Sequence, residues 1–287
     1  MKYNFCYFIL SHERADNVQT YKELKKLNTK YPIFIIIDDT DSQQELYKEK
    51  YGDNVIIFNK KEYKTKLHID MFDNFENMIN CVIPRNYCFY IAKRMGFDYF
   101  AELDDDYNSI QFRIPDYTKQ KLYCKDISDF DNIIDIHLNF LENTPTVSLA
   151  FAQGGDYIGG INSRLIQKQY RRKSMNFIFH KTNRPVKYIG TLNDDVTAYT
   201  HWGSIGQIYL TFPHLNVHQT PTQQQKGGLT DAYQDGTYLK SIYSLLPSPR
   251  QIKITYSPGM KRIHHLIQWK YTTPCILNQK YKKNEGT

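Results

Sequence analysis

Apolar runs alternate with amphipathic segments along the first third of the chain. The apolar runs predict strands, and in the segments between them apolar residues recur every three to four positions, as in helices. The predicted strands cover residues 3–10, 32–39, 54–59 and 98–106, and the predicted helices cover residues 17–28, 41–52 and 84–96. We expect Asp16 to be the N-cap of the first helix, and Gly52 and Gly96 to end the other two. This alternation predicts an α/β fold with a doubly wound, mostly parallel sheet.

The pattern beyond residue 110 is less regular. Helical patterns occur at residues 131–142, 194–204 and 237–247, and strand patterns occur at residues 146–155, 175–182, 186–190, 207–213 and 250–256. We expect this part to extend the first sheet with mixed α/β structure and to build a second binding surface.

The composition is that of a globular protein with a substantial core, because 41% of its 287 residues are hydrophobic and 23% are charged. An apolar run of roughly 18 residues, which a membrane-spanning helix needs, does not occur. The five cysteines are scattered without metal-ligand spacing, and their odd number argues against a disulfide framework. We therefore expect a reducing, cytosolic setting.

Net charge is +7, which is compatible with a polyanionic partner but does not require one. Basic residues cluster around Tyr170, at Arg164, Lys168, Arg171, Arg172 and Lys173. Two interpretations stay open here: a solvated basic face, or a groove for phosphate backbones.

Carboxylates end two of the predicted strands. Asp38 and Asp39 follow one apolar run, and three consecutive aspartates at 104–106 follow another. In a doubly wound sheet both ends face the same crevice. Mg²⁺ and Mn²⁺ are bound by one or two carboxylates together with ligand phosphates, so Asp104 and Asp106 suit a metal that bridges to a diphosphate. Acidic triplets at such junctions are also common as solvated turns.

A second acidic pair, Asp194 and Asp195, directly precedes a helical pattern. Acids at this position stabilise a first helical turn, and they also suit a general base in the crevice. Late in the chain, His264 and His265 are either structural or ligands for Mn²⁺.

Two arginines are candidates for contact with a nucleotide. Arg14 follows the first predicted strand, in "SHERADN", and Arg85 lies in "PRN". A guanidinium group suits phosphates or a base.

These features, in this order, resemble the GT-A class of nucleotide-sugar glycosyltransferases over roughly residues 3 to 270. A narrower resemblance is to the TET-associated glycosyltransferases, which occur mainly in bacteriophages. It is carried by "PRNYCFYIAKRMGFDYFAELDDD", "GTLNDDV", "KGGLTDAYQDGTYLKSIYSLLPSP" and "KRIHHLIQWK".

The narrower resemblance implies transfer of a sugar to a hydroxymethylated pyrimidine in DNA, for which we expect 5-hydroxymethylcytosine. The implied donor is a nucleotide sugar, for which we expect a UDP-sugar, and the implied cofactor is Mn²⁺ or Mg²⁺. It implies one GT-A domain, with a nucleotide-sugar-binding half at 1–110 and an acceptor-binding half at 111–287. We infer no membrane and no obligate protein partner, and a host cytoplasm if a phage encodes the chain.

The resemblance also implies roles for individual residues. It places Asp38, Asp39, Asp104 and Asp105 in the nucleotide-sugar site, and we expect Ser11, Arg14 and Arg85 to belong to the same site. The metal ligands are Asp104, Asp106 and one of His264 and His265, and the catalytic acids are Asp194 and Asp195. The acceptor or DNA surface comprises Arg164, Tyr170, Arg171, Arg172, Lys173, Thr230, Asp231 and Tyr233. Asp195 takes the place of the catalytic base, which predicts inversion at the anomeric carbon. The usual pattern has glutamate where this chain has Asp194.

Two alternatives stay open. In the first, the same kind of enzyme acts on a polysaccharide, a lipid-linked sugar or a protein. In the second, the chain is a non-catalytic nucleic-acid-binding relic of a transferase, which would be expected to lack the metal site.

Overall fold

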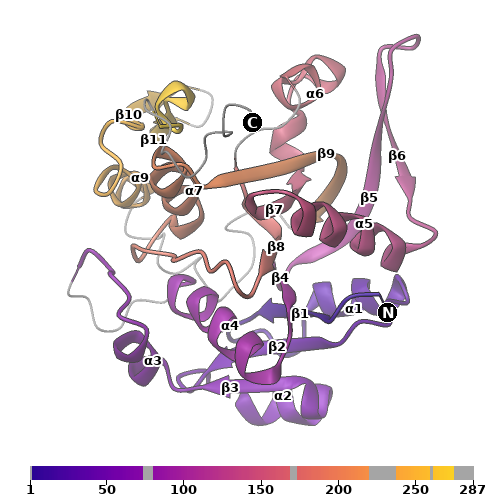
Figure 1. Cartoon of the computed structure of the whole chain (residues 1–287), viewed down its shortest axis with the longest axis vertical. Helices are drawn as coiled ribbons and strands as arrows, with labels where there is room; N and C mark the ends of the chain where they lie inside the picture. The colour runs from indigo at the N-terminus through magenta and orange to yellow at the C-terminus, as the bar shows by residue number, and fades with distance from the viewer. Residues whose placement is uncertain (1, 74–79, 169–172, 220–236, 259–260, 275–287) are drawn as a thin grey trace, which may run out of the picture.

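The computed structural model describes residues 2–73, 80–168, 173–219, 237–258 and 261–274 (Figure 1). In these ranges a nine-stranded sheet has the order β3-β2-β1-β4-β8-β7-β9-β5-β6, and β10 and β11 form a separate pair. The strands of the first half are β1 (Phe5–Leu10), β2 (Ile33–Asp38), β3 (Val55–Phe58) and β4 (Tyr99–Asp104). Those that follow are β5 (Tyr107–Asp116), β6 (Lys121–Asp126), β7 (Thr146–Gln153), β8 (Asn176–Lys181), β9 (Ile208–Gln219), β10 (Ile252–Ser257) and β11 (Arg262–Ile267).

Helices flank the sheet. They are α1 (Gln19–Lys26), α2 (Gln44–Tyr51), α3 (Lys60–Lys66), α4 (Val82–Met95), α5 (Phe130–Asn143), α6 (Arg164–Lys168), α7 (Asp194–Ser204) and α9 (Thr237–Leu245). Short 3₁₀ turns are η1 (Gly52–Asn54), η2 (Gly154–Tyr157), η3 (Gly160–Asn162) and η4 (Trp269–Tyr271).

The first four strands are parallel, as the sequence predicts: β1 pairs with β2 and β4, and β2 pairs with β3. Every residue of β1 is buried, because a strand inside a parallel sheet is covered on both faces. Its side chains alternate between two hydrophobic clusters. One cluster contains Phe5, Tyr7 and Ile9, and the other contains Cys6, Phe8 and Leu10. Helices α1, α2 and α5 contribute to the first cluster and α3, α4 and α7 to the second, so the sheet is covered on both sides.

The second half continues the same sheet with mixed strand directions. Strand β8 is antiparallel to β4 and β7, whereas β7 and β9 are parallel. Strand β5 runs antiparallel to both β9 and β6. Because β5 spans residue 110, the boundary expected between the two halves falls inside a strand. Helices α3 and α6 and the strands β5, β6 and β11 were not predicted from the sequence.

Two local predictions are wrong. Helix α1 begins at Gln19 and Val18 is at its N-cap position, while Asp16 instead forms an ion pair with Lys50. Residues 186–190 do not form a strand. The Asn86 side chain takes the place of a strand partner there: it accepts from the backbone N–H of Tyr188 at 3.1 Å and donates to its carbonyl at 2.9 Å.

The predicted helix ends at Gly52 and Gly96 are confirmed, with φ values of +56° and +81° that suit glycine. Cys6, Cys81, Cys88 and Cys124 are free, and Cys275 lies outside the described residues. None of the helices in the described ranges is both long and apolar enough to span a bilayer.

Candidate active site

Strands β1, β2 and β4 end at one edge of the sheet, with β1 in the middle. Leu10, the last residue of β1, pairs with Ile36 on one side and Asp104 on the other. Asp38 ends β2 two residues beyond Ile36. Asp38 and Asp104 therefore lie at the same edge of the sheet, as predicted, and the crevice that they are expected to face stays a prediction.

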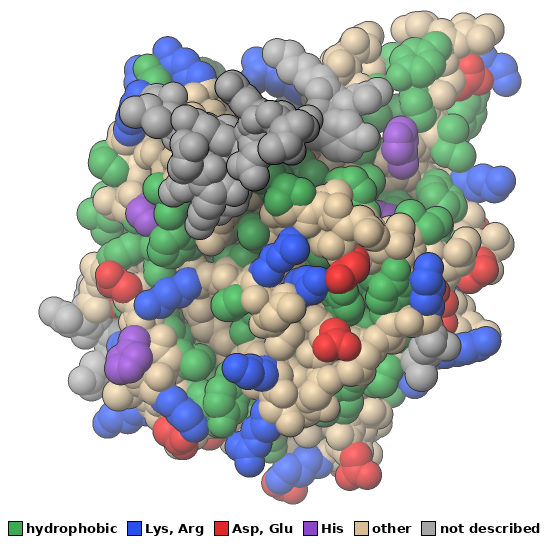
Figure 2. Space-filling model, viewed as in Figure 1, with side chains coloured by type: hydrophobic (Ala, Val, Ile, Leu, Met, Phe, Trp, Pro, Cys, Tyr) green, Lys and Arg blue, Asp and Glu red, His purple; other side chains and the backbone are tan. Residues whose placement is uncertain are grey.

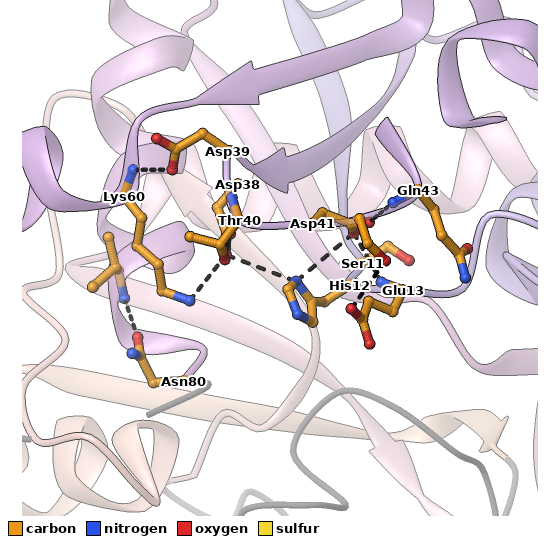
Figure 3. Close-up of polar contacts among 12 residues, drawn as sticks. Ser11, His12, Glu13, Asp38, Asp39, Thr40, Asp41, Gln43, Lys60 and Asn80 are labelled. Carbon is orange, nitrogen blue, oxygen red and sulfur yellow. Dashed lines mark hydrogen bonds and ion pairs between the residues drawn. The ribbon is translucent and has the colours of Figure 1, made fainter. Parts of the chain in front are cut away.

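Asp38 is a buried carboxylate with several partners (Figure 3). It accepts hydrogen bonds from the Thr40 backbone N–H at 3.0 Å and from the Thr40 hydroxyl, and Nζ of Lys60 lies 3.0 Å away. Burial tends to raise the pKa of Asp38, but Lys60, Thr40 and His12 outweigh it, so the pKa lies below its ordinary value. This carboxylate is ionised and held in place.

The neighbouring acids are fixed in the same way. Asp39 accepts a hydrogen bond from the Lys60 backbone N–H at 2.9 Å, and Asp41 accepts from the N–H groups of Glu13 at 2.8 Å and Gln43 at 2.7 Å. Nδ1 of His12 lies between Asp38 and Asp41, 3.9 Å from the first carboxylate and 3.7 Å from the second (Figure 3).

The sequence reasoning did not assign His12, Asp41 or Lys60 to this edge of the crevice. His12 stands next to Ser11 in "SHER", so its place in that motif was the available signal.

Asp105, the middle aspartate of the triplet, is 3% exposed and turned toward the loop after β1. It accepts a hydrogen bond from Ser11 Oγ at 2.6 Å and forms an ion pair with Nη1 of Arg14 at 2.7 Å. Burial raises its pKa, although Arg14 and Ser11 oppose the shift. The structure thus brings three predicted nucleotide-binding residues together, but they contact one another and brace the strand ends.

Arg85, on α4, is 5% exposed and lies among three acids. Its Nη1 is 3.2 Å from Oε2 of Glu102, and its Nη2 is 3.3 Å from Oδ1 of Asp104. Its Nε is 2.8 Å from Oδ2 of Asp194, without the alignment of a hydrogen bond. Glu102 is fully buried, so a compensating cation is required. Arg85 therefore connects β4 to α7, which its predicted contact with a nucleotide did not anticipate.

The acidic pair Asp194 and Asp195 forms the first turn of α7. Burial raises the pKa of Asp194 to about 7; Arg85 opposes this shift, while Asp195 and Asp104 add to it. Asp195 is more exposed, and its Oδ1 accepts a hydrogen bond from the Val196 N–H at 2.7 Å. Both predicted roles, a helix N-terminal acid and an acid in the crevice, are thus compatible with this position.

Asp106 is the least satisfied member of the triplet. Its Oδ1 is buried and has no hydrogen-bond partner within the described ranges. Burial raises its pKa to about 7, and Asp104 and Asp105 add to the shift. Burial likewise raises the pKa of Asp104, whose side chain is 37% exposed. An unpaired buried oxygen beside a half-exposed carboxylate fits a hard divalent cation, which supplies the missing charge.

The two histidines lie on β11 with ring centroids 4.3 Å apart. Nδ1 of His265 is 3.3 Å from the amide nitrogen of Asn193, the residue just before α7. Burial lowers the pKa of His265 to about 3, and His264, Lys240 and Arg262 add to the shift. Both rings thus lie close to cations.

Within the described parts of the chain, no three His, Cys, Asp or Glu side chains form a group that could hold a metal ion. The role of His264 or His265 as a metal ligand therefore stays a prediction.

The predicted acceptor surface is described only in part. Arg164 is exposed at the start of α6. Lys173 is 6% exposed, and its Nζ lies 2.5 Å from Asp156, so its charge neutralises a buried acid and does not join an exposed basic face. Tyr170, Arg171, Arg172, Thr230, Asp231 and Tyr233 lie outside the described residues. Figure 2 shows basic side chains interspersed with acidic ones over the visible face.

Comparison with known proteins gives one family. The family described as TAGT, TET-Associated Glycosyltransferase, matches residues 5–228. No curated protein matches the chain.

Among solved structures, a mannosyltransferase from Pyrobaculum calidifontis in complex with GDP-Man and Mn²⁺ is 10% identical, with a TM-score of 0.50 over 91% of this chain and 68% of that one. A glucosyl-3-phosphoglycerate synthase from Mycobacterium tuberculosis, in complex with Mg²⁺ and UDP, is 7% identical, with a TM-score of 0.46 over 93% and 88%. A mycobacterial protein is 7% identical, with a TM-score of 0.46 over 93% of this chain and 84% of that one. The predicted GT-A-type fold is confirmed.

Proposed function

Because this chain belongs to the TET-associated glycosyltransferase family and is a glycosyltransferase, we propose that it modifies DNA. The proposed reaction transfers a sugar from a nucleotide diphosphosugar to the hydroxyl of 5-hydroxymethylcytosine. The observation that carries the proposal is the meeting of acids from β4 and α7 around Arg85, close to Asp106, whose Oδ1 has no hydrogen-bond partner among the residues that the structure describes.

Asp104 and Asp106 are the residues that would hold a divalent cation, Mn²⁺ or Mg²⁺. Two carboxylates at a crevice are the usual protein share of such a site, with phosphate oxygens completing it. When bound, the cation supplies positive charge against the leaving diphosphate. The mannosyltransferase of similar fold was solved with GDP-Man and Mn²⁺, and we extend both ligand classes to this chain.

The nucleotide belongs beside the ends of β1 and β2. Asp38 and Asp39 supply acceptors for a ribose or a base, while His12 and Lys60 add donors within the same group. These side chains are held by one another, so the surface is ready before the donor binds. We propose a UDP-sugar as the donor.

Asp195 is the proposed general base. It takes the proton of the acceptor hydroxyl as that oxygen bonds to the anomeric carbon, and the bond from this carbon to the diphosphate oxygen breaks. The configuration at the carbon is then inverted. Asp194 is a positioning residue, because its ion pair with Arg85 fixes the start of α7 against β4.

The acceptor is proposed to bind beyond α7. Arg164 is exposed as a phosphate contact requires, and the segments at 169–172 and 220–236 carry the other predicted contacts. A hydroxymethyl base reaches such a pocket from single-stranded DNA, or after it is flipped out of the duplex.

The test is to incubate the protein with Mn²⁺, DNA that contains 5-hydroxymethylcytosine, and a panel of nucleotide sugars. Released nucleoside diphosphate and the mass of the digested nucleosides are measured, with Asp106→Ala as the control. A sugar-sized mass gain that the control lacks supports the proposal. Donor turnover with no gain on DNA, but with activity on an oligosaccharide or protein, would move the acceptor elsewhere.

A further inference from the structure

The hairpin of β5 and β6 extends beyond the rest of the sheet. Strand β5 pairs with β9 only over residues 107–112, whereas its pairing with β6 runs over residues 111–116. Residues 113–124 therefore form a two-stranded arm, which Figure 1 shows rising at the upper right. Strand β5 starts at Tyr107, directly after Asp106, so the arm continues a strand that begins at the acidic site.

One face of this arm is anchored. Cross-strand pairing places Arg113, Pro115, Leu122 and Cys124 on the same face. Leu122 packs against a cluster of residues from β7, η2, η3 and α6: Ala152, Tyr157, Ile161, Leu165 and Ile166. The guanidinium of Arg113 lies 5.3 Å from the centre of the Tyr157 ring. Since Leu165 neighbours Arg164, the arm is close to the exposed basic start of α6.

The opposite face of the arm is open. It carries the cross-strand pair of Ile114, 43% exposed, and Tyr123, 40% exposed. Lys121, and Lys125 just below the arm, are exposed on the same face of β6. Apolar and basic side chains therefore alternate on a surface that faces water.

The tip of the arm adds a tyrosine and a lysine. Tyr117 is 58% exposed, more than either Ile114 or Tyr123. The carboxylate of Asp116 accepts a hydrogen bond from the Lys119 N–H at 2.9 Å, and the Gln120 amide donates to the Tyr117 carbonyl at 2.7 Å. The acid at the tip is thus engaged with the turn. Lys119 is exposed, and its ammonium lies over the Tyr123 ring, 5.8 Å from the ring centre.

Lysines on an edge strand also prevent pairing with another sheet, which is sufficient to explain β6. That explanation does not account for the exposed tyrosines, which favour association. Lysines beside exposed aromatic rings are the combination that binds nucleic acid, through phosphates and through base stacking. A two-stranded ribbon also has the width of a DNA major groove.

We propose that the outward face of the β5–β6 arm is a DNA-binding surface that holds the acceptor DNA further along β5, the strand that begins at the acidic site. This inference rests on the proposed DNA acceptor. Lys119, Lys121 and Lys125 contact phosphates, and Tyr117 and Tyr123 contact bases. The arm acts in binding only and takes no part in turnover of the donor.

The test compares two triple variants in their affinity for fluorescein-labelled DNA, single-stranded and duplex, that contains 5-hydroxymethylcytosine. One variant is Lys119→Gln, Lys121→Gln, Lys125→Gln. The matched control is Lys48→Gln, Lys61→Gln, Lys93→Gln, which removes the same charge from exposed positions on α2, α3 and α4. Fluorescence anisotropy gives the dissociation constant at several salt concentrations, and light scattering gives the oligomeric state.

We expect the arm variant to bind DNA at least about tenfold more weakly than the control. The slope of the logarithm of the binding constant against the logarithm of the salt concentration should fall by the equivalent of roughly two to three phosphate contacts. Donor hydrolysis should be equal in both variants. Tyr117→Ala should weaken binding to the single strand about fivefold or more, whereas Tyr117→Phe, which keeps the ring, should not.

Equal DNA affinity of the two triple variants, while the wild type modifies DNA, would overturn the arm and leave the proposed function intact. A wild-type protein that neither binds nor modifies DNA would overturn both. A change of oligomeric state in the arm variant, with unchanged DNA affinity, would instead make the arm an interface between copies of this chain.

Discussion

Two groups of acids lie at the same edge of one sheet and are built in opposite ways. The first, at the end of β2, comprises Asp38, Asp39 and Asp41. The second, at the end of β4 and the start of α7, comprises Asp104, Asp106, Asp194 and Asp195. In the first group, backbone N–H groups and Lys60 surround the carboxylates, and the pKa of Asp38 is lowered. In the second, burial raises the pKa of both Asp106 and Asp194 to about 7.

The difference shows which group is complete without a ligand. Carboxylates that already have donors gain little from a cation. Carboxylates that are buried close together lower the stability of the folded state when they ionise, and a bound cation removes that cost. Perturbed pKa values of this kind occur at functional sites more often than elsewhere. We therefore propose the second group as the reactive one, and the first as a prepared surface for the nucleotide.

The largest effect is expected from the proposed base. Asp195→Asn should lower kcat for DNA glycosylation by about a thousandfold, because an amide cannot take the hydroxyl proton. Quenched-flow measurement at saturating donor gives the rate, with the exposed Asp53→Asn as a matched acid-to-amide control. A loss below about tenfold would remove Asp195 from this role.

Arg85 is the next test, since it compensates the buried Glu102 together with Asp104 and Asp194 of the second group. Arg85→Gln should lower the free energy of unfolding by about 3–5 kcal/mol, because it leaves buried charges unpaired. Arg85→Lys should cost less stability but still lower kcat, since an ammonium cannot span the same acids as a guanidinium. Urea unfolding and steady-state kinetics measure the two effects. Equal stability of Arg85→Gln and the wild type would show that Arg85 does not stabilise the buried acids around it.

Asp106→Asn should stabilise the protein in the presence of a chelator. The pKa of Asp106 is about 7 when folded and 3.8 ordinarily, so the folded state holds its proton longer as the pH rises. Stability is therefore lost between about pH 4 and pH 7, and asparagine avoids that loss. We expect a gain of roughly 1–2 kcal/mol at pH 8 and none at pH 3.5, with loss of activity. Thermal unfolding at both pH values measures it; a variant less stable at pH 8 would contradict the account.

Asp38→Asn should change the stability in the opposite direction, and by the smallest amount. Because the folded pKa of Asp38 is lowered, its carboxylate stabilises the protein above the ordinary pKa, and this contribution is lost as the pH falls through the folded value. We expect a loss of about 1 kcal/mol at pH 8, together with a higher KM for the donor. A gain in stability at pH 8 would erase the contrast between the two groups.

Much of the sheet could be predicted because its inner strands are buried on both faces and read as continuous apolar runs. The β5–β6 hairpin could not, since β6 is exposed along nearly all its length and carries no apolar pattern. The strand predicted at residues 186–190 was wrong for the opposite reason. Its apolar residues are buried, but its hydrogen-bond partner is the Asn86 side chain, which no periodicity reveals.

The positions of the site acids were also readable, because parallel strands end at one edge. Their partners were not. Ser11, Arg14 and Asp105 satisfy one another, and the guanidinium of Arg85 turns to Asp194, a residue more than 100 positions away. Lys173 belongs to a basic run, yet it is buried against Asp156. Such pairings depend on the packed arrangement of distant segments, which a one-dimensional charge pattern does not contain.

The most direct test of the contrast is calorimetric titration of Mn²⁺ into the protein with a nucleoside diphosphate present. The wild type and Asp38→Asn should both bind the ion, although Asp38→Asn should bind the nucleotide more weakly. Asp106→Asn should bind no Mn²⁺. Equal Mn²⁺ binding by the wild type and Asp106→Asn would contradict the claim that the unsatisfied acids are the cation site.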